Sequence, residues 1–263
     1  FIFNLIREVF YMSKYVNYFL LSAIIACMPL VSFAGTNLAP NDPVGISFWI
    51  ISVAMVAATA FFFLESLRVQ GKFRTSLVVG GLICLVAGVH YFYMREVWAS
   101  TGSSPTVFRY VDWIVTVPLQ MVEFYLILAA VTAVSLGVFW RLLIGTVVMV
   151  VAGYLGEAGF IDTTIGFVVG MGGWAYILYE IFSGEASASA SKAAPAVQSA
   201  FNTMKWIVTI GWAIYPLGYF LGYMTGGGAD ADTLNIVYNV ADFINKIGFC
   251  LAIWAAATTQ ADA

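Results

Sequence analysis

Two ionisable residues interrupt a long apolar stretch near the C-terminal end of the chain. Asp242 and Lys246 are four positions apart, so in a helix their side chains lie on one face, about one turn from each other. One interpretation is a buried ion pair that fixes helix packing. The other is a lysine amine that forms a Schiff base with an aldehyde ligand, while Asp242 helps to neutralise the resulting cation. The second is favoured, because an ion pair that is costly to desolvate is rarely kept for packing alone.

A second polar series interrupts an apolar stretch in the first half of the chain. Asp112, Thr116, Gln120 and Glu123 follow the i, i+4, i+8, i+11 spacing of one helix face, and Arg109 lies one turn before Asp112. At a rise of about 1.5 Å per residue, the two carboxylates are about 16 Å apart along the helix axis. A proton acceptor on one side of a central base and a donor on the other is the layout that vectorial proton transfer needs.

The composition of the chain suits a lipid bilayer. Of its 263 residues 62% are hydrophobic and 10% are charged, whereas a soluble domain carries about 25% charged residues. The net charge of −3 comes without a basic block, which argues against nucleic-acid binding. Cys27, Cys84 and Cys250 have no spacing typical of a metal or redox site, so they are interpreted as small buried hydrophobic residues and no metal is expected.

Seven apolar segments are long enough to cross a bilayer core of about 30 Å as helices. They are 46–67, 76–98, 107–131, 140–158, 164–182, 202–224 and 233–257. The linkers between them are short and polar or rich in glycine. The longest, 183–199, carries Ala/Ser repeats and is predicted to be flexible. The sequence therefore predicts an all-α, polytopic membrane protein: one bundle of seven transmembrane helices, with no second domain.

The N-terminal part of the chain has the features of a secretory signal. Lys14 follows Met12, an apolar run comes next, and Ser32-Phe33-Ala34 has the form of a cleavage site. The alternative is an eighth transmembrane helix at 15–33. We divide the chain into three parts, namely 1–11 as upstream or artificial sequence, 12–34 as signal peptide and 35–263 as the seven-helix domain.

Charge asymmetry and the signal peptide predict the same orientation. With the N-terminus outside, the cytoplasmic linkers and adjoining helix ends hold Arg68, Lys72, Arg74, Arg141, Lys192 and Lys205. The outer ones hold Arg95 together with Glu96, Asp162, Asp230 and Asp232. This distribution follows the positive-inside rule, so the C-terminus is expected in the cytoplasm.

These segments resemble the microbial rhodopsins, and among them the blue-absorbing proteorhodopsins. The resemblance covers the whole chain after the signal. It is carried by Gly45–Trp49, Ser104–Ala130, Gly153–Gly159, Ser199–Thr203, Gly211–Tyr219 and Tyr238–Lys246. It implies a bacterial inner-membrane protein that holds all-trans retinal in the core of its bundle.

The resemblance also implies a role for each ionisable residue. Lys246 would carry retinal as a protonated Schiff base, Asp112 would accept its proton, and Asp242 would be a second counterion. Glu123 would be the donor that reprotonates the Schiff base from the cytoplasmic side. The trio of Asp112, Thr116 and Glu123 resembles the signature of outward proton pumps, whereas sodium and chloride pumps of the family depart from it.

The retinal pocket implied by the resemblance is mostly aromatic. Such side chains usually form core, but here they match family positions: Trp113, Met149, Phe167, Trp174, Trp212, Tyr215 and Pro216. Pro216 also favours a kink in its helix. Gln120 would lie against the polyene, where glutamine marks blue-absorbing and leucine green-absorbing proteorhodopsins. The alternative is that Gln120 only hydrogen-bonds a neighbouring helix.

The family comparison extends to partners. The single histidine, His90, would hydrogen-bond Asp112 and reach Trp49 of a neighbouring subunit in a pentameric or hexameric ring; the alternative is a solvated or core histidine. The turn Glu65-Ser66-Leu67-Arg68 carries less charge than in many proteorhodopsins, which weakens the case for some of these contacts. Phe167 replaces a glycine typical of carotenoid-binding relatives, which argues against an antenna pigment.

The function implied is a light-driven outward proton pump, which is a transporter and not an enzyme. The main alternative is a light sensor that signals through a separate transducer, although Glu123 is a donor that sensors often lack. A transporter or receptor without retinal is disfavoured by Lys246 and Asp242. For the proton-release side the sequence offers Glu157 and the acidic outer linkers, and it does not choose among them.

Overall fold

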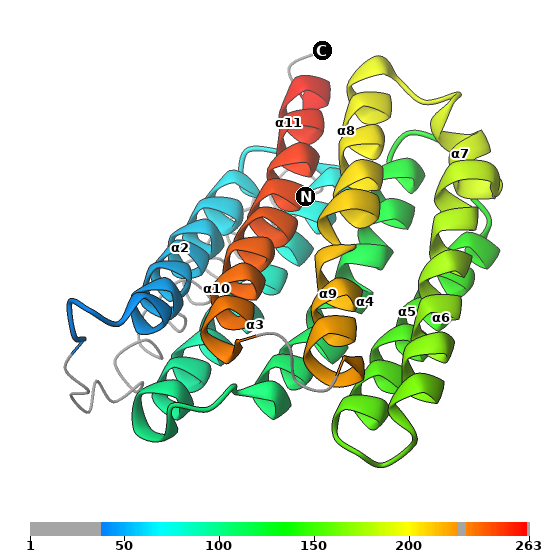
Figure 1. Ribbon diagram of the computed structural model, residues 1–263. Helices are drawn as coiled ribbons and strands as arrows, with labels where there is room; N and C mark the ends of the chain where they lie inside the picture. Colours follow the sequence, from blue (N-terminus) through cyan, green and yellow to red (C-terminus); the bar gives the residue numbers. More distant parts are fainter. Residues whose placement is uncertain (1–37, 226–229, 262–263) are drawn as a thin grey trace, which may run out of the picture. The chain divides into compact units, whose positions relative to one another are not determined.

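The computed structural model describes residues 38–225 and 230–261. Within these residues, seven helical segments are long and apolar enough to cross a membrane, which confirms the predicted all-α bundle (Figure 1). Four are the helices α2 (Pro43–Glu65), α3 (Gly71–Thr101), α4 (Thr106–Ala129) and α5 (Leu136–Glu157). The predicted upstream segment, the signal peptide with its eighth-helix alternative, and Cys27 lie outside the described residues.

The other three segments are composite. The fifth joins α6 (Thr163–Ser183) to α7 (Glu185–Ala190). The sixth consists of α8 (Pro195–Trp206), the π-helical turn η2 (Ile207–Gly211), α9 (Ile214–Tyr219) and a second π-helical turn η3 (Phe220–Met224). The seventh consists of α10 (Ala231–Asp242), the π-helical turn η4 (Phe243–Gly248) and α11 (Phe249–Ala261). Lys246 therefore lies in η4, where backbone hydrogen bonds span five residues instead of four.

Acidic residues cap three of the helices that begin at one end of the bundle. The Asp42 carboxylate accepts a hydrogen bond from Gly45 N (2.8 Å) before α2, and Asp162 accepts one from Thr164 N (2.9 Å) before α6. Asp230 does the same for Thr233 N (3.2 Å) before α10. A carboxylate at this position satisfies free backbone N–H groups and interacts favourably with the helix dipole.

The predicted flexible linker at 183–199 is wrong, because most of it is helical. Alanine is the strongest helix former, and Ala186 and Ala190 of α7 are buried. Arg141 of α5 holds the segment in place through ion pairs with Glu180 (2.8 Å) and Glu185 (2.8 Å). Long-range ion pairs of this kind cannot be read from Ala/Ser composition.

The sixth segment is irregular just before Pro216, as the proline predicts. Proline has no backbone N–H to donate to Trp212 O, four residues earlier. Trp212 O instead accepts a hydrogen bond from Tyr215 N (3.1 Å), and regular α-helical bonding is interrupted between η2 and α9. The interruption lies beside the widened turn η4, since η2 and η4 contact each other.

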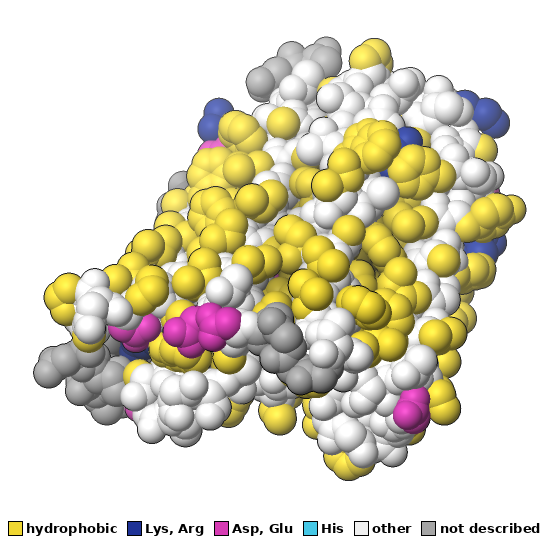
Figure 2. Space-filling view, in the orientation of Figure 1, with side chains coloured by type: hydrophobic (Ala, Val, Ile, Leu, Met, Phe, Trp, Pro, Cys, Tyr) yellow, Lys and Arg dark blue, Asp and Glu magenta, His cyan; other side chains and the backbone are white. Residues whose placement is uncertain are grey.

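The outer surface of the bundle is suited to lipid. Hydrophobic side chains cover most of the face in Figure 2, and the charged side chains lie near its edges. Large apolar residues are exposed on several helices, among them Ile50, Val53, Ile144, Val168, Ile210 and Leu217. A water-soluble monomer rarely exposes so wide an apolar surface. The chain is therefore a membrane protein.

Candidate functional site

Lys246 lies between two carboxylates in the middle of the bundle. Its Nζ is 2.8 Å from Asp112 Oδ2 and 2.9 Å from Asp242 Oδ2. The three side chains are 2%, 0% and 1% exposed, so water does not screen the two ion pairs. The polar faces predicted for two separate segments therefore meet at one buried amine.

The two carboxylates differ in how firmly they are held. Asp242 accepts hydrogen bonds from the hydroxyls of Tyr91 (2.8 Å) and Tyr215 (2.6 Å), one on each oxygen. Asp112 Oδ1 has no hydrogen-bond partner. Thr116 Oγ1 donates to the backbone oxygen of Asp112 (3.0 Å), so it contacts the peptide group and not the carboxylate. Asp112 thus keeps one oxygen open, whereas Asp242 is satisfied on both.

Arg109 is buried one turn from Asp112, and asparagines hold it. Its Nη2 donates to Asn235 Oδ1 (3.0 Å) and Asn239 Oδ1 (3.1 Å), while Nε and Nη1 have no partner. The sequence analysis missed both asparagines. With Asp242 and Lys246 they follow i, i+4, i+7, i+11 spacing on one helix face. The same polar pattern that singled out α4 could therefore have revealed them.

Glu123 lies far from this cluster along α4, in a buried position. Its side chain is fully buried, and neither carboxyl oxygen has a hydrogen-bond partner. The neighbouring polar side chain is Ser76 of α3, whose Oγ is also buried without a partner. The rings of Phe124 and Phe249, 5.7 Å apart between centroids, belong to the surrounding apolar core.

His90 does not make the hydrogen bond expected of it. Its Nδ1 lies 2.9 Å from Val86 O, four residues earlier on α3, so Nδ1 donates to its own helix. Asp112 Oδ1 meanwhile accepts no hydrogen bond. The predicted bond between these two side chains is therefore absent from the structure.

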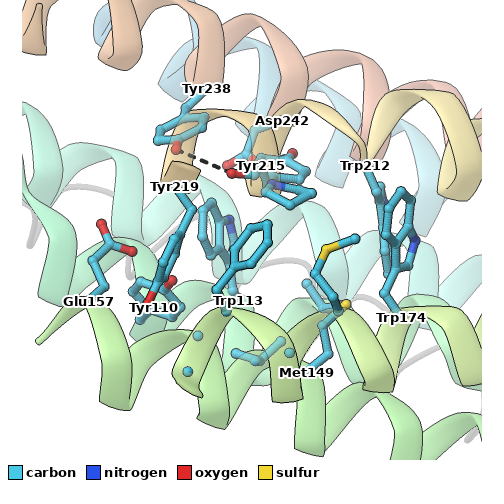
Figure 3. A pocket seen from close by; sticks show the side chains of 18 of the residues that line it. Tyr110, Trp113, Met149, Glu157, Trp174, Trp212, Tyr215, Tyr219, Tyr238 and Asp242 are labelled. Atoms are coloured by element: carbon cyan, nitrogen blue, oxygen red, sulfur yellow. Dashed lines mark hydrogen bonds between the residues drawn. The ribbon is translucent and has the colours of Figure 1, made fainter. Parts of the chain in front are cut away.

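An aromatic cavity adjoins Lys246, and the predicted pocket residues line it. They are Trp113, Gln120, Met149, Phe167, Trp174, Trp212, Tyr215 and Pro216. Figure 3 shows Trp174 and Trp212 together at one side of the cavity, with Met149 between them and Trp113. Apolar walls and one reactive amine fit an elongated apolar aldehyde such as retinal.

Gln120 combines the two roles that the sequence left as alternatives. It lines the cavity, and its Nε2 donates to Asn245 O (2.7 Å) in η4. Asn245 was not predicted as a site residue. Its Nδ2 donates to Gly211 O (3.0 Å) and to Tyr215 Oη (3.1 Å), so it ties η4 to the sixth segment. The turn that carries Lys246 is therefore fixed from two sides.

The comparisons with known proteins agree with this geometry. The family model for bacteriorhodopsin-like proteins matches residues 42–260. The chain is 53% identical over 234 residues to the blue-light absorbing proteorhodopsin of Gamma-proteobacterium Hot 75m4, which covers 89% of this chain and 93% of the relative. It is 50% identical over 241 residues to the green-light absorbing proteorhodopsin of Gamma-proteobacterium EBAC31A08, covering 92% and 96%.

A solved structure matches equally well. The blue light-absorbing proteorhodopsin from Med12 superposes with a TM-score of 0.72 at 54% identity, covering 83% of this chain and all of that one. The match to the family model spans nearly all the described residues, including both carboxylates and the lysine between them. The chain belongs to the bacteriorhodopsin-like protein family.

Proposed function

We propose that this chain is a light-driven proton pump that holds all-trans retinal on Lys246 and moves protons outward. The observation that carries the proposal is the position of Lys246 Nζ, which lies within 2.9 Å of two buried carboxylates at the wall of an aromatic cavity. Bound to Nζ as a protonated Schiff base, retinal would supply light absorption and a bond whose isomerisation changes the proton affinity of that nitrogen.

Asp112 is the proton acceptor in this proposal. Its Oδ2 is already in hydrogen-bond contact with Lys246 Nζ, and its Oδ1 is free to carry or pass on a proton. Asp242 remains a carboxylate, because two tyrosine hydroxyls donate to it and both bonds would be weakened if it were protonated. One acid thus changes its charge while the other keeps neutralising Lys246 and Arg109.

Glu123 is the proton donor on the opposite side. It lies eleven residues after Asp112, or about 16 Å along the helix axis. A buried carboxyl group without hydrogen-bond partners is strongly disfavoured as an anion, so Glu123 holds a proton at rest. It gives up that proton when the site opens to water, which restores the proton on Lys246 Nζ.

The charge distribution supports the outward direction. Arg68, Lys72, Arg141 and Lys205 belong to the end of the bundle that is nearer to Glu123, and the capping residues Asp42, Asp162 and Asp230 belong to the other. Under the positive-inside rule the first end is cytoplasmic and the N-terminus lies outside. Placed in a bacterial inner membrane, Glu123 then takes protons from the cytoplasm and Asp112 passes them outward.

Two proposals concern binding partners, namely other copies of the chain and a carotenoid. We propose a ring of five or six copies in the bilayer, with Trp49 and His90 near the subunit contact. The guanidinium of Arg95 on α3 lies 4.4 Å from the centroid of the Trp49 ring on α2, and this contact holds the ring in place.

We also propose that no carotenoid binds as an antenna. The Phe167 ring packs on Tyr219 (5.6 Å) and Phe220 (6.4 Å), where such a pigment would need space.

Illumination of cells that express the protein with retinal supplied tests the pump. The suspension should acidify in light and recover in darkness, and a protonophore should abolish the change. A light sensor would absorb and cycle without moving the external pH. A coloured protein that gives no protonophore-sensitive pH change would favour the sensor and contradict the pump.

Absorption should shift to the red in acid. Protonating Asp112 removes a negative charge 2.8 Å from Lys246 Nζ, so the ground-state cation is less stabilised and the excitation gap narrows. Spectra recorded from mildly alkaline to acidic pH check this. Asp112→Asn should absorb further to the red at every pH and lose most of the titration. A wild-type spectrum that is constant over this range would contradict the assignment.

Gln120 should tune the colour to the blue. Excitation of protonated retinal moves positive charge away from Lys246, and a fixed amide dipole beside the cavity can stabilise the ground state more than the excited state. Gln120→Leu should therefore shift the absorption maximum to longer wavelength while proton pumping continues. Gln120→Met keeps the side-chain length without the amide dipole, so it should shift the maximum in the same direction and controls for cavity shape. An unchanged or blue-shifted maximum in Gln120→Leu would remove Gln120 as the tuning residue.

A further inference from the structure

Two buried thiols meet where α3 packs against α11. Cys84 of α3 and Cys250 of α11 are 0% and 1% exposed, and their side chains are hydrogen-bonding neighbours. The sequence analysis interpreted both as small buried hydrophobic residues, and the structure confirms their burial. A thiol is also a weak hydrogen-bond donor and acceptor. Their contact therefore places two exchangeable protons inside the bundle, in addition to those of the carboxyl groups.

Cys250 lies one helical turn beyond Lys246. The two residues are four positions apart, so they share a face of the seventh segment. That segment and α4 are the seventh and third of seven successive spans, so they run in the same direction. The Phe249 ring contacts the Phe124 ring at 5.7 Å between centroids, which brings the start of α11 to the level of Glu123. Cys250 is therefore displaced from Lys246 toward Glu123.

One buried face of α3 extends from Glu123 to the ion pairs. Ser76, Cys84 and Tyr91 lie on this face at i, i+8 and i+15 spacing, and all three are fully buried. Ser76 is the polar neighbour of Glu123 at one end, and Tyr91 donates to Asp242 at the other. Along the helix axis Cys84 is about 12 Å from Ser76 and about 10 Å from Tyr91. The thiols therefore lie about halfway between the two sites.

Gly80 lets the Cys250 thiol reach the backbone of α3. Cys250 Sγ donates to Gly80 O at 3.7 Å. A Cβ at this glycine would lie 3.3 Å from the same sulfur, so a side chain there would push the thiol away by a few tenths of an ångström. The place of the Cys250 thiol is therefore set by a backbone contact and by Cys84, and not by apolar packing alone.

The polar groups at the Glu123 end have no hydrogen-bond partner of their own. Both carboxyl oxygens of Glu123 and Oγ of Ser76 are buried and unpaired. The Cys250 thiol is close enough for a charge on Glu123 to act on it. An exchangeable S–H proton therefore lies in the direction in which a proton from Glu123 has to travel to Lys246.

We propose that the thiols of Cys84 and Cys250 relay the proton from Glu123 to Lys246 Nζ. The proposal rests on the pump and on the donor role of Glu123 proposed above. The O–H bond of Glu123 breaks and an S–H bond forms, while the S–H bond already present breaks. Its proton passes on through water that enters the site and forms the N–H bond at Nζ. Each thiol ends the step with the one proton it had, and Glu123 remains an anion until a cytoplasmic proton reaches it.

Flash spectroscopy of Cys250→Ser and Cys250→Ala tests the relay. Both substitutions remove the sulfur, but only serine keeps a group that donates and accepts hydrogen bonds. Alanine should slow the return of the proton to Lys246 Nζ by about tenfold or more, whereas serine should stay within about threefold of the wild type. Cys84→Ala and Cys84→Ser should follow the same order. The colour and the early transfer to Asp112 should not change, and an unchanged colour shows that a variant is folded.

Time-resolved infrared spectra give a second readout, which a packing role would not move. Only cysteine produces S–H stretching bands. In the wild type such a band should change as Glu123 loses its proton and recover when the photocycle ends. The change should be absent from the double variant Cys84→Ala/Cys250→Ala.

The matched control is Thr146→Val, which keeps the shape of a buried side chain on α5 and removes its hydroxyl. That hydroxyl donates to Leu142 O (2.7 Å) on its own helix, so the variant should return the proton at the wild-type rate. The relay is overturned if both alanine variants keep the wild-type rate, or if serine is as slow as alanine, because lost packing then explains the delay. A late step of normal speed in Glu123→Gln would instead contradict the donor, and a wild type that moves no protons would contradict the pump.

Discussion

Lys246→Ala is expected to give a protein without visible absorption, even when retinal is supplied in excess. Lys246 Nζ is the amine at the cavity wall, and both neighbouring carboxylates contact it. Alanine removes the only atom of this residue that can bond to an aldehyde and leaves the aromatic walls of the cavity in place. The measurement is the visible spectrum of the purified variant beside that of the wild type.

The variant also leaves two buried carboxylates without their cation, so its folding needs a separate check. Lys246→Arg keeps a positive charge between Asp112 and Asp242 and cannot form the imine. It should be colourless yet elute as the wild type does in gel filtration. Normal colour in either variant would show that retinal is held elsewhere, and the assignment of the site would fail.

The second large effect is expected for Glu123→Gln. The amide keeps the shape of the side chain in its buried site but cannot supply a proton. Loss of a positioned general acid typically slows proton transfer by about 10²–10⁴-fold. The last part of the photocycle, in which the proton on Lys246 Nζ is restored, should therefore slow by about this factor. Flash spectroscopy at the wavelength of the deprotonated state measures it.

The colour of Glu123→Gln and the early transfer to Asp112 should not change, because Glu123 does not line the cavity. Added azide, a small weak acid, should restore the late step by carrying protons to the site. Ser76→Ala is a useful companion, since Ser76 is the polar neighbour of Glu123. A photocycle in Glu123→Gln as fast as that of the wild type would refute the donor role.

The fold and most of the site follow from the sequence, because the bilayer imposes simple rules. Each span needs about 20 apolar residues, and charged residues inside a span stand out against that background. Lys246, Asp242 and Asp112 could therefore be singled out before their contacts were known. The eight residues expected at the pocket also line one cavity.

What the sequence did not reveal depends on contacts between distant residues. The linker at 183–199 is helical because Arg141 pairs with Glu180 and Glu185. His90 Nδ1 donates to Val86 O on its own helix, a contact that the position of His90 in the sequence does not reveal. Asn245 is an ordinary polar residue in sequence, and its importance lies in the three bonds by which it holds η4.

Light should drive a net outward current of protons through the pair of Lys246 and Asp112. The most direct measurement is the stationary photocurrent of the protein in membranes where its orientation has been determined, with protons as the sole permeant cation. The proposal predicts a current directed from the Glu123 end of the bundle to the Glu157 end, and none in Asp112→Asn. A sustained current in the reverse direction, or one that persists in Asp112→Asn, would contradict it.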